Sequence, residues 1–220
     1  MSRHALTIVL MAGMVSIPAL PIRGATAAPD ATEHTFIAEN NAAMAKMMAA
    51  MTIRPSGDVD RDFVAMMIPH HQGAIDMAQA ELRYGSNQQL LRLAQEIVVE
   101  QLQEITAMRN AVGGAVSTPD AARAATGEAP FLHANDAAMA AMMAGMTARL
   151  TGNIDRAFVA MMVPHHQGAI DMAKAELRYG HNARLHRIAQ EIVVDQMQEI
   201  TLMRLAVGDT LPPAIAAPTK

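Results

Sequence analysis

The chain has 220 residues, a formal net charge of −4 and no cysteine. The length allows one large domain or two small ones, and the charge offers no basic surface for nucleic acid or an anionic membrane. Without cysteine the protein has neither disulfides nor thiolate ligands, so soft-metal chemistry has to use thioethers and imidazoles. The 20 methionines and 9 histidines supply these groups in abundance.

Residues 1–28 have the pattern of an export signal. Arg3 precedes an apolar run at 5–17, and small residues lead up to position 28. A membrane anchor is the alternative, but Pro18 and Pro21 interrupt the run well short of the roughly 20 apolar residues that a spanning helix needs. We therefore expect removal of this segment, a periplasmic or secreted protein, and no membrane contact afterwards.

The rest of the chain contains a duplicated unit. Residues 58–113 align without gaps on residues 153–208, and 42 of these 56 positions are identical at an offset of 95. A tandem repeat of this kind has to be recognised before single motifs are interpreted. The predicted organisation is a first repeat at 36–113, a linker rich in Gly, Ala, Thr and Pro at 114–130, a second repeat at 131–208, and an irregular tail at 209–220.

Each repeat is predicted to form three helices and no strand. In the first repeat these helices cover about 37–51, from an Asp58 N-cap to Tyr84, and about 87–112, with Gly85 as a left-handed cap between the last two. The fold class is therefore all-α. The four long helices are expected to form one pseudo-twofold four-helix bundle with extra methionine-rich helices; two separate three-helix units are the alternative.

A pair of adjacent histidines lies in the middle of the second helix of each repeat. The first pair follows two methionines and a proline, in the order Met66-Met67-Ile68-Pro69-His70-His71. Residues four apart share a helix face, whereas adjacent residues differ by about 100° in direction. His70 and His71 are therefore predicted to join separate clusters or separate neighbouring helices. Pro69 either lies inside this helix and frees a carbonyl or begins a new helix.

Four methionines form a stripe on the first helix of each repeat, at 44, 47, 48 and 51 and at 139, 142, 143 and 146. Thioethers prefer soft ions such as Cu(I) and Ag(I), and imidazole extends the range to Cu(II). The alternative is ordinary core packing, because methionine fills irregular gaps well. Leucine, isoleucine and valine are used freely in the third helix while methionine is concentrated in the first two, which favours metal binding.

Carboxylates recur along the third helix of each repeat. Glu96, Glu100 and Glu104 correspond to Glu191, Asp195 and Glu199 in the second repeat. Glu104 is nearest the apolar stripe. It either orients a metal-binding histidine without binding the metal itself or belongs to a solvated face. Glu81 has the same two interpretations.

The segments 60–78 and 155–173 share the pattern M-M-x-P-H-H-Q-G-A-I-D-M-A and resemble domain-of-unknown-function family 305. The resemblance implies a ferritin-like fold and a periplasmic protein that binds copper and contributes to copper tolerance. It also implies copper or silver binding by the Met and His residues of the two motifs. Together with the two methionine stripes, the candidate metal ligands are Met44, Met47, Met48, Met51, Met66, Met67, His70, His71, Met77, Met139, Met142, Met143, Met146, Met161, Met162, His165, His166 and Met172.

The predicted function is a periplasmic Cu(I)- or Ag(I)-binding protein for copper buffering, sequestration or resistance, without catalytic residues. Its expected partners are metal ions and other periplasmic copper-handling proteins. One alternative is a ferritin-like metal-dependent oxidase, although the chain has none of the Glu-x-x-His motifs on which di-iron sites of such bundles depend. The other is a helical interaction module that binds no metal.

Overall fold

The computed structural model describes residues 31–113, 121–146 and 152–210, and this part of the chain is helical with no strand. The all-α prediction is thus confirmed. The predicted export signal and residues 211–220 of the predicted tail lie outside the described residues. No described helix is long and apolar enough to cross a membrane. The six helices are α1 (Ala31–Ala50), α2 (Val59–Tyr84), α3 (Gln88–Gly113), α4 (Ala121–Gly145), α5 (Ile154–Tyr179) and α6 (Ala183–Ala206).

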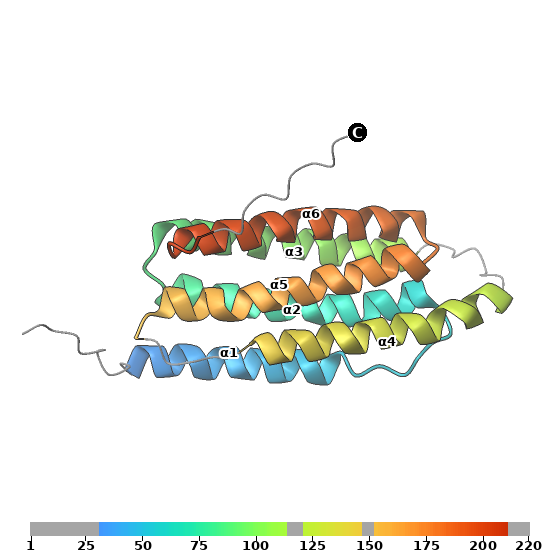
Figure 1. Cartoon of the computed structure of the whole chain (residues 1–220), viewed down its shortest axis with the longest axis horizontal. Coiled ribbons are helices and arrows are strands. Elements are labelled where there is room, and N and C mark those ends of the chain that lie inside the picture. The colour runs from blue at the N-terminus through green and yellow to red at the C-terminus, as the bar shows by residue number, and fades with distance from the viewer. Residues whose placement is uncertain (1–30, 114–120, 147–151, 211–220) are drawn as a thin grey trace, which may run out of the picture.

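The helices form three layers of two, each layer taking one helix from each repeat (Figure 1). Helices α2, α3, α6 and α5 contact one another in that order and close into a four-helix bundle. Helix α1 covers α2, and α4 covers α5, on the side away from α3 and α6. The two repeats therefore share one core, as the pseudo-twofold bundle predicts, and do not form separate three-helix units.

Reciprocal hydrogen bonds at the helix ends join the two repeats. Asp155, at the start of α5, accepts the backbone N–H groups of Ser86 and Asn87 at 2.8 and 2.9 Å, and also the Ser86 hydroxyl. Asp60, at the start of α2, accepts two backbone N–H groups of the α5–α6 connection at 2.9 and 3.0 Å. Each repeat thus satisfies helix-terminal donors of the other, which would otherwise be unpaired.

The repeat extends further upstream than predicted. Glu33 of α1 accepts from the Gly152 backbone N–H at 3.0 Å, and Glu128 of α4 accepts from the Gly57 N–H at 2.6 Å. Both glycines have positive φ, 82° for Gly57 and 72° for Gly152, a conformation that glycine adopts at little cost. The prediction of a linker at 114–130 is wrong for 121–130, because that segment is helical and carries one of these paired contacts.

The predicted left-handed cap at Gly85 is also wrong. Gly85 has φ −70° and ψ 163°, an extended conformation, and its N–H donates to the Glu81 carbonyl at 2.7 Å. Its small size is needed for a different reason. A Cβ added at Gly85 would overlap the Glu81 carboxyl and lie 2.7 Å from the Glu81 carbonyl oxygen. Gly180 stands in the same relation to Glu176.

The Gly85→Ala variant is therefore expected to lower the free energy of unfolding by about 1–3 kcal/mol, the usual cost of forcing atoms into a packed site. Gly113→Ala is the control, because an added Cβ there meets nothing within 4 Å. Urea unfolding followed by circular dichroism measures both variants. If the two variants are equally stable, the Glu81 side chain moves away from the added methyl group at no cost in free energy.

Candidate metal centre

The four paired histidines lie at the centre of the bundle. His70 and His71 of α2 and His165 and His166 of α5 are all completely buried. Pro69 lies inside α2 and does not begin a new helix. Because proline has no N–H, the helical hydrogen bond to the Ala65 carbonyl is not formed. The structure thus confirms the alternative in which Pro69 lies inside the helix and frees a carbonyl.

Two of these imidazoles meet across the repeats. The rings of His70 and His165 have their centroids 3.9 Å apart at an interplanar angle of 46°. Desolvation by burial, with a smaller contribution from the neighbouring imidazoles, lowers the pKa of both histidines well below 6.5. Both rings are therefore neutral near pH 7, and each has a ring nitrogen with a free lone pair for a metal ion.

A methionine from a third helix reaches the same point. Met47 Sδ of α1 lies 3.3 Å from His165 Nε2. Gly73 allows this approach, because an added Cβ there would lie 2.8 Å from the Met47 sulfur. In the second repeat Met142 packs on Gly168 in the same way, with its sulfur 3.2 Å from the position of an added Cβ. The glycines of the two motifs therefore bring α1 and α4 close to the histidine helices.

The other two histidines, His71 and His166, face carboxylates of the neighbouring layer, which is formed by α3 and α6. His71 Nε2 lies 2.8 Å from Glu104 Oε2, in hydrogen-bonding geometry. His166 Nε2 lies at the same distance from Glu199 Oε2, but without the alignment that a hydrogen bond requires. The structure therefore supports the interpretation in which Glu104 orients a histidine, and not the one in which it belongs to a solvated face. Adjacent histidines of one motif thus point to different helices, as their angular separation predicts.

The central imidazoles have polar atoms without partners. Among the described residues, no hydrogen-bond partner reaches either ring nitrogen of His70 or Nδ1 of His165. Leaving such atoms unpaired costs about 1–3 kcal/mol each, a cost that a metal ion bound to these nitrogens would offset. Neutral imidazoles with free lone pairs beside a thioether suit a soft ion such as Cu(I). In the described part of the chain, no group of three or more His, Asp or Glu side chains is arranged to hold a metal ion.

The remaining candidate ligands divide by burial. Met48, Met139 and Met146 are half-buried, while Met143 is 45% exposed. The methionine stripe is therefore better buried in the first repeat than in the second. The buried candidate methionines line the common core and are Met44, Met47, Met51, Met66, Met67, Met77, Met142, Met161, Met162 and Met172.

Two kinds of buried polar residue were not predicted from the sequence. Gln101 and Gln196 are 2% exposed, and no hydrogen-bond partner reaches their side-chain amides among the described residues. Their place on the apolar stripe of the third helix was the available signal. Glu81 and Glu176 are also fully buried, and no sequence pattern separates them from solvated carboxylates.

Each buried glutamate lies beside an aspartate of the other repeat. Desolvation, together with the neighbouring Asp155, raises the pKa of Glu81 to about 9. Desolvation also raises the pKa of Asp155, but the backbone donors of Asn87 and Ser86 outweigh it and lower the pKa overall. The proton therefore resides on Glu81 and not on Asp155. Burial and Asp60 raise the pKa of Glu176 to about 9 in the same way.

Comparisons with known proteins agree with the repeat organisation. The model of domain-of-unknown-function family DUF305 matches residues 7–112 and 114–207. A crystal structure of a DUF305 fragment from Deinococcus radiodurans is 28% identical with a TM-score of 0.50, and the match covers 70% of this chain and 99% of the fragment. No curated protein matches the chain.

Structures of CopM are also similar. CopM in the Ag-bound form, obtained by soaking, is 30% identical with a TM-score of 0.48, covering 66% of this chain and 92% of CopM. CopM in the Cu(I)-bound form is 29% identical with the same TM-score, covering 66% and 93%. The family model matches twice in succession and spans nearly the whole sequence. The chain therefore belongs to the DUF305 family, as two tandem copies.

Proposed function

We propose that this protein binds Cu(I), with Ag(I) as an equivalent, at a centre formed by His70, His165 and Met47, and that it buffers or sequesters copper after export to the periplasm. One observation carries the proposal. Two neutral, buried imidazoles from different repeats face each other, with both ring nitrogens of His70 and Nδ1 of His165 unpaired, and the Met47 sulfur lies 3.3 Å from the other nitrogen of His165, Nε2.

The ligand set favours a soft monovalent ion. All three groups are neutral, so a single positive charge enters the bundle with no carboxylate to bind a hard cation in its place. Neither the thioether nor the neutral imidazoles need to lose a proton to bind, and without cysteine the site cannot oxidise to a disulfide. The site is thus suited to bind Cu(I) in an oxidising compartment.

His71 and His166 are not metal ligands in this proposal. Glu104 occupies Nε2 of His71, a carboxylate–histidine pairing of the kind that fixes imidazole orientation around metal sites. The proposed role of His71 is therefore to hold α2 in register with α3. The function is binding and not catalysis; oxidation of Cu(I) well beyond the stoichiometric amount would instead favour a ferritin-like oxidase.

The proposal predicts that Met47→Leu weakens Cu(I) binding by roughly 10–100-fold, because it removes one ligand with little change in volume. Met143→Leu, which changes an exposed methionine of the second stripe, is expected to bind as the wild type does. Competition with a Cu(I) chelator under anaerobic conditions, and Ag(I) calorimetry of the same proteins, give the affinities. Wild-type affinity weaker than micromolar would refute the proposed function.

A further inference from the structure

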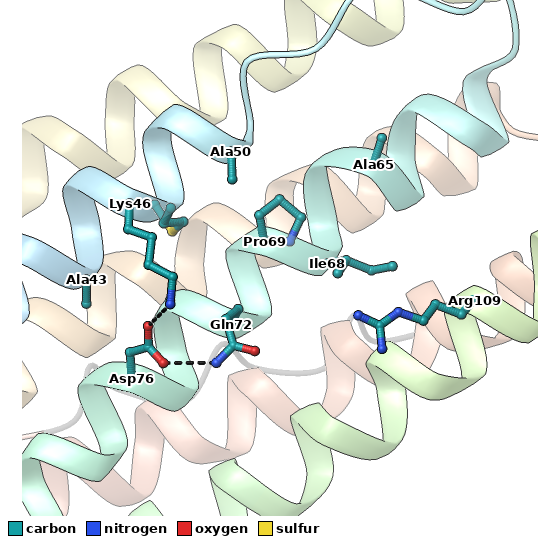
Figure 2. Close-up of a pocket in the computed structure, with 11 residues that line it drawn as sticks. Ala43, Lys46, Ala50, Ala65, Ile68, Pro69, Gln72, Asp76 and Arg109 are labelled. Atoms are coloured by element: carbon teal, nitrogen blue, oxygen red, sulfur yellow. Dashed lines mark hydrogen bonds and ion pairs between the residues drawn. The ribbon is translucent and has the colours of Figure 1, made fainter.

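A cavity of about 310 Å³ opens beside the proposed centre, between α1 and α2 (Figure 2). Met47, Pro69 and Gly73 contribute to its wall. Lys46 and Asp76 also line it and form an ion pair at 3.0 Å, in which the Lys46 side chain is 67% exposed. The cavity thus has a charged, exposed part and a part formed by apolar residues.

Met47 connects this cavity with the buried histidines. Its side chain lines the cavity, and its sulfur lies 3.3 Å from His165 Nε2. Met47 is only 2% exposed, with the cavity wall included, so an ion in the cavity reaches the sulfur only when the methionine side chain turns toward the opening. Methionine is unbranched and has three rotatable bonds, so its sulfur can move between two positions without displacement of the helix.

The second repeat differs at the matching positions. Gly145 stands where the first repeat has Ala50, and Ala141 stands where it has Lys46. An added Cβ at Gly145 would lie 2.8 Å from Pro164 Cβ, so α4 packs directly on α5 there. In the first repeat the Ala50 side chain points toward Pro69 across the cavity (Figure 2), and both residues line it. The opening beside Lys46 therefore belongs to the first repeat.

We propose that this cavity is the port through which the metal ion is loaded, with Met47 as the first ligand to capture the ion and His165 as the ligand that receives it. The inference rests on the proposed function and adds a direction to it, because the ion enters through the first repeat. Lys46 and Arg109 place two positive charges on the cavity wall against the single carboxylate of Asp76, so the wall as a whole slows the entry of a cation.

Ala50→Leu tests the port by filling it at the side that faces Pro69. Cu(I) transfer from a coloured bicinchoninate complex is expected to slow by about 10-fold or more, while the equilibrium affinity stays within about twofold, because the ligands remain in place. Ala49→Leu is the matched control: the neighbouring residue is exposed and does not line the cavity. Equal transfer rates for the two variants, or a loss of affinity in Ala50→Leu, would overturn the port.

Lys46→Ala is a second test with little risk to folding, because the lysine is exposed. It removes one positive charge from the entrance and leaves Asp76 with the neutral Gln72 amide as a partner at 2.9 Å, so transfer is expected to become several-fold faster and more sensitive to salt. An unchanged or slower rate would contradict the proposal. The two proposals fail differently: wild-type protein that does not bind Cu(I) refutes the function, whereas normal affinity with unaltered rates in both variants refutes only the port.

Discussion

Replacement of His70 and His165 together by leucine is expected to abolish the stabilisation of the protein by Ag(I) or Cu(I) without destabilising the metal-free form. In the wild type, a ligand at 1,000 times its dissociation constant raises the free energy of unfolding by about 4 kcal/mol. The double variant lacks both central imidazoles, so this increment should disappear. Thermal unfolding with and without Ag(I), followed by circular dichroism, measures it.

The stability of the metal-free double variant distinguishes a binding site from a structural pair. Ring nitrogens of both histidines are buried without hydrogen-bond partners among the described residues. Because replacing unpaired buried polar groups by apolar groups of similar size removes their desolvation cost, we expect the metal-free variant to be as stable as the wild type or more stable. Histidines retained at a cost to stability are typical of functional sites.

His34→Leu combined with His133→Leu is the matched control, since both histidines are exposed and each repeat contributes one. This control should keep the full increment on addition of Ag(I). Two results would contradict a metal site at the centre. The variant without His70 and His165 could still be stabilised by Ag(I), or it could unfold at a much lower temperature than the control in the absence of metal.

Between pH 7 and pH 9 the free energy of unfolding is expected to fall as pH rises, because of Glu81 and Glu176. Both have folded-state pKa values of about 9, raised from 4.5 by burial beside an aspartate. The folded protein therefore binds protons that the unfolded chain has released, which makes the slope of stability against pH negative in this window. Each glutamate contributes roughly 1 kcal/mol per pH unit until its own pKa is reached.

The window starts at pH 7 because other groups titrate below it. His70 and His165, whose pKa values are lowered by burial, protonate more readily in the unfolded chain, so their contribution to stability is lost as pH falls below about 6.5. That effect opposes the effect of the glutamates at acidic pH. Above pH 7 it has disappeared. Glu100, whose pKa is raised to about 7 by desolvation and neighbouring carboxylates, adds to the slope only near pH 7, so Glu81 and Glu176 account for the slope between pH 8 and pH 9.

Glu81→Gln combined with Glu176→Gln should make stability nearly independent of pH from 8 to 9, above the pKa of Glu100. Glutamine has nearly the size of the protonated acid and is likewise uncharged, but it does not titrate. Glu96→Gln with Glu191→Gln changes one exposed carboxylate in each repeat and should keep the wild-type slope. Urea unfolding at several pH values tests this, and a slope unchanged by the first pair would show that Glu81 and Glu176 are ionised in the folded protein.

Several features of the fold and centre were predictable because they depend on local order along the chain. The repeat at an offset of 95 predicts a pseudo-twofold arrangement, and helical periodicity predicts that His70 and His71 point to different helices. The carboxyl terminus of α2 at Tyr84 and the Asp58 cap also agree with prediction. The start of α4 was not predictable in this way, because the first ten residues of the helix include glycine and proline and have the composition of a linker.

The sequence by itself determined that this is an all-helical, duplicated, cysteine-free protein whose histidines lie among methionines. Only the tertiary structure decided that His70 faces His165, that Met47 joins them, and that Glu81 is buried near Asp155. The physical reason is distance along the chain. Periodicity orders the faces of one helix, but it does not specify which faces of two helices far apart along the chain meet, as those carrying His70 and His165 do.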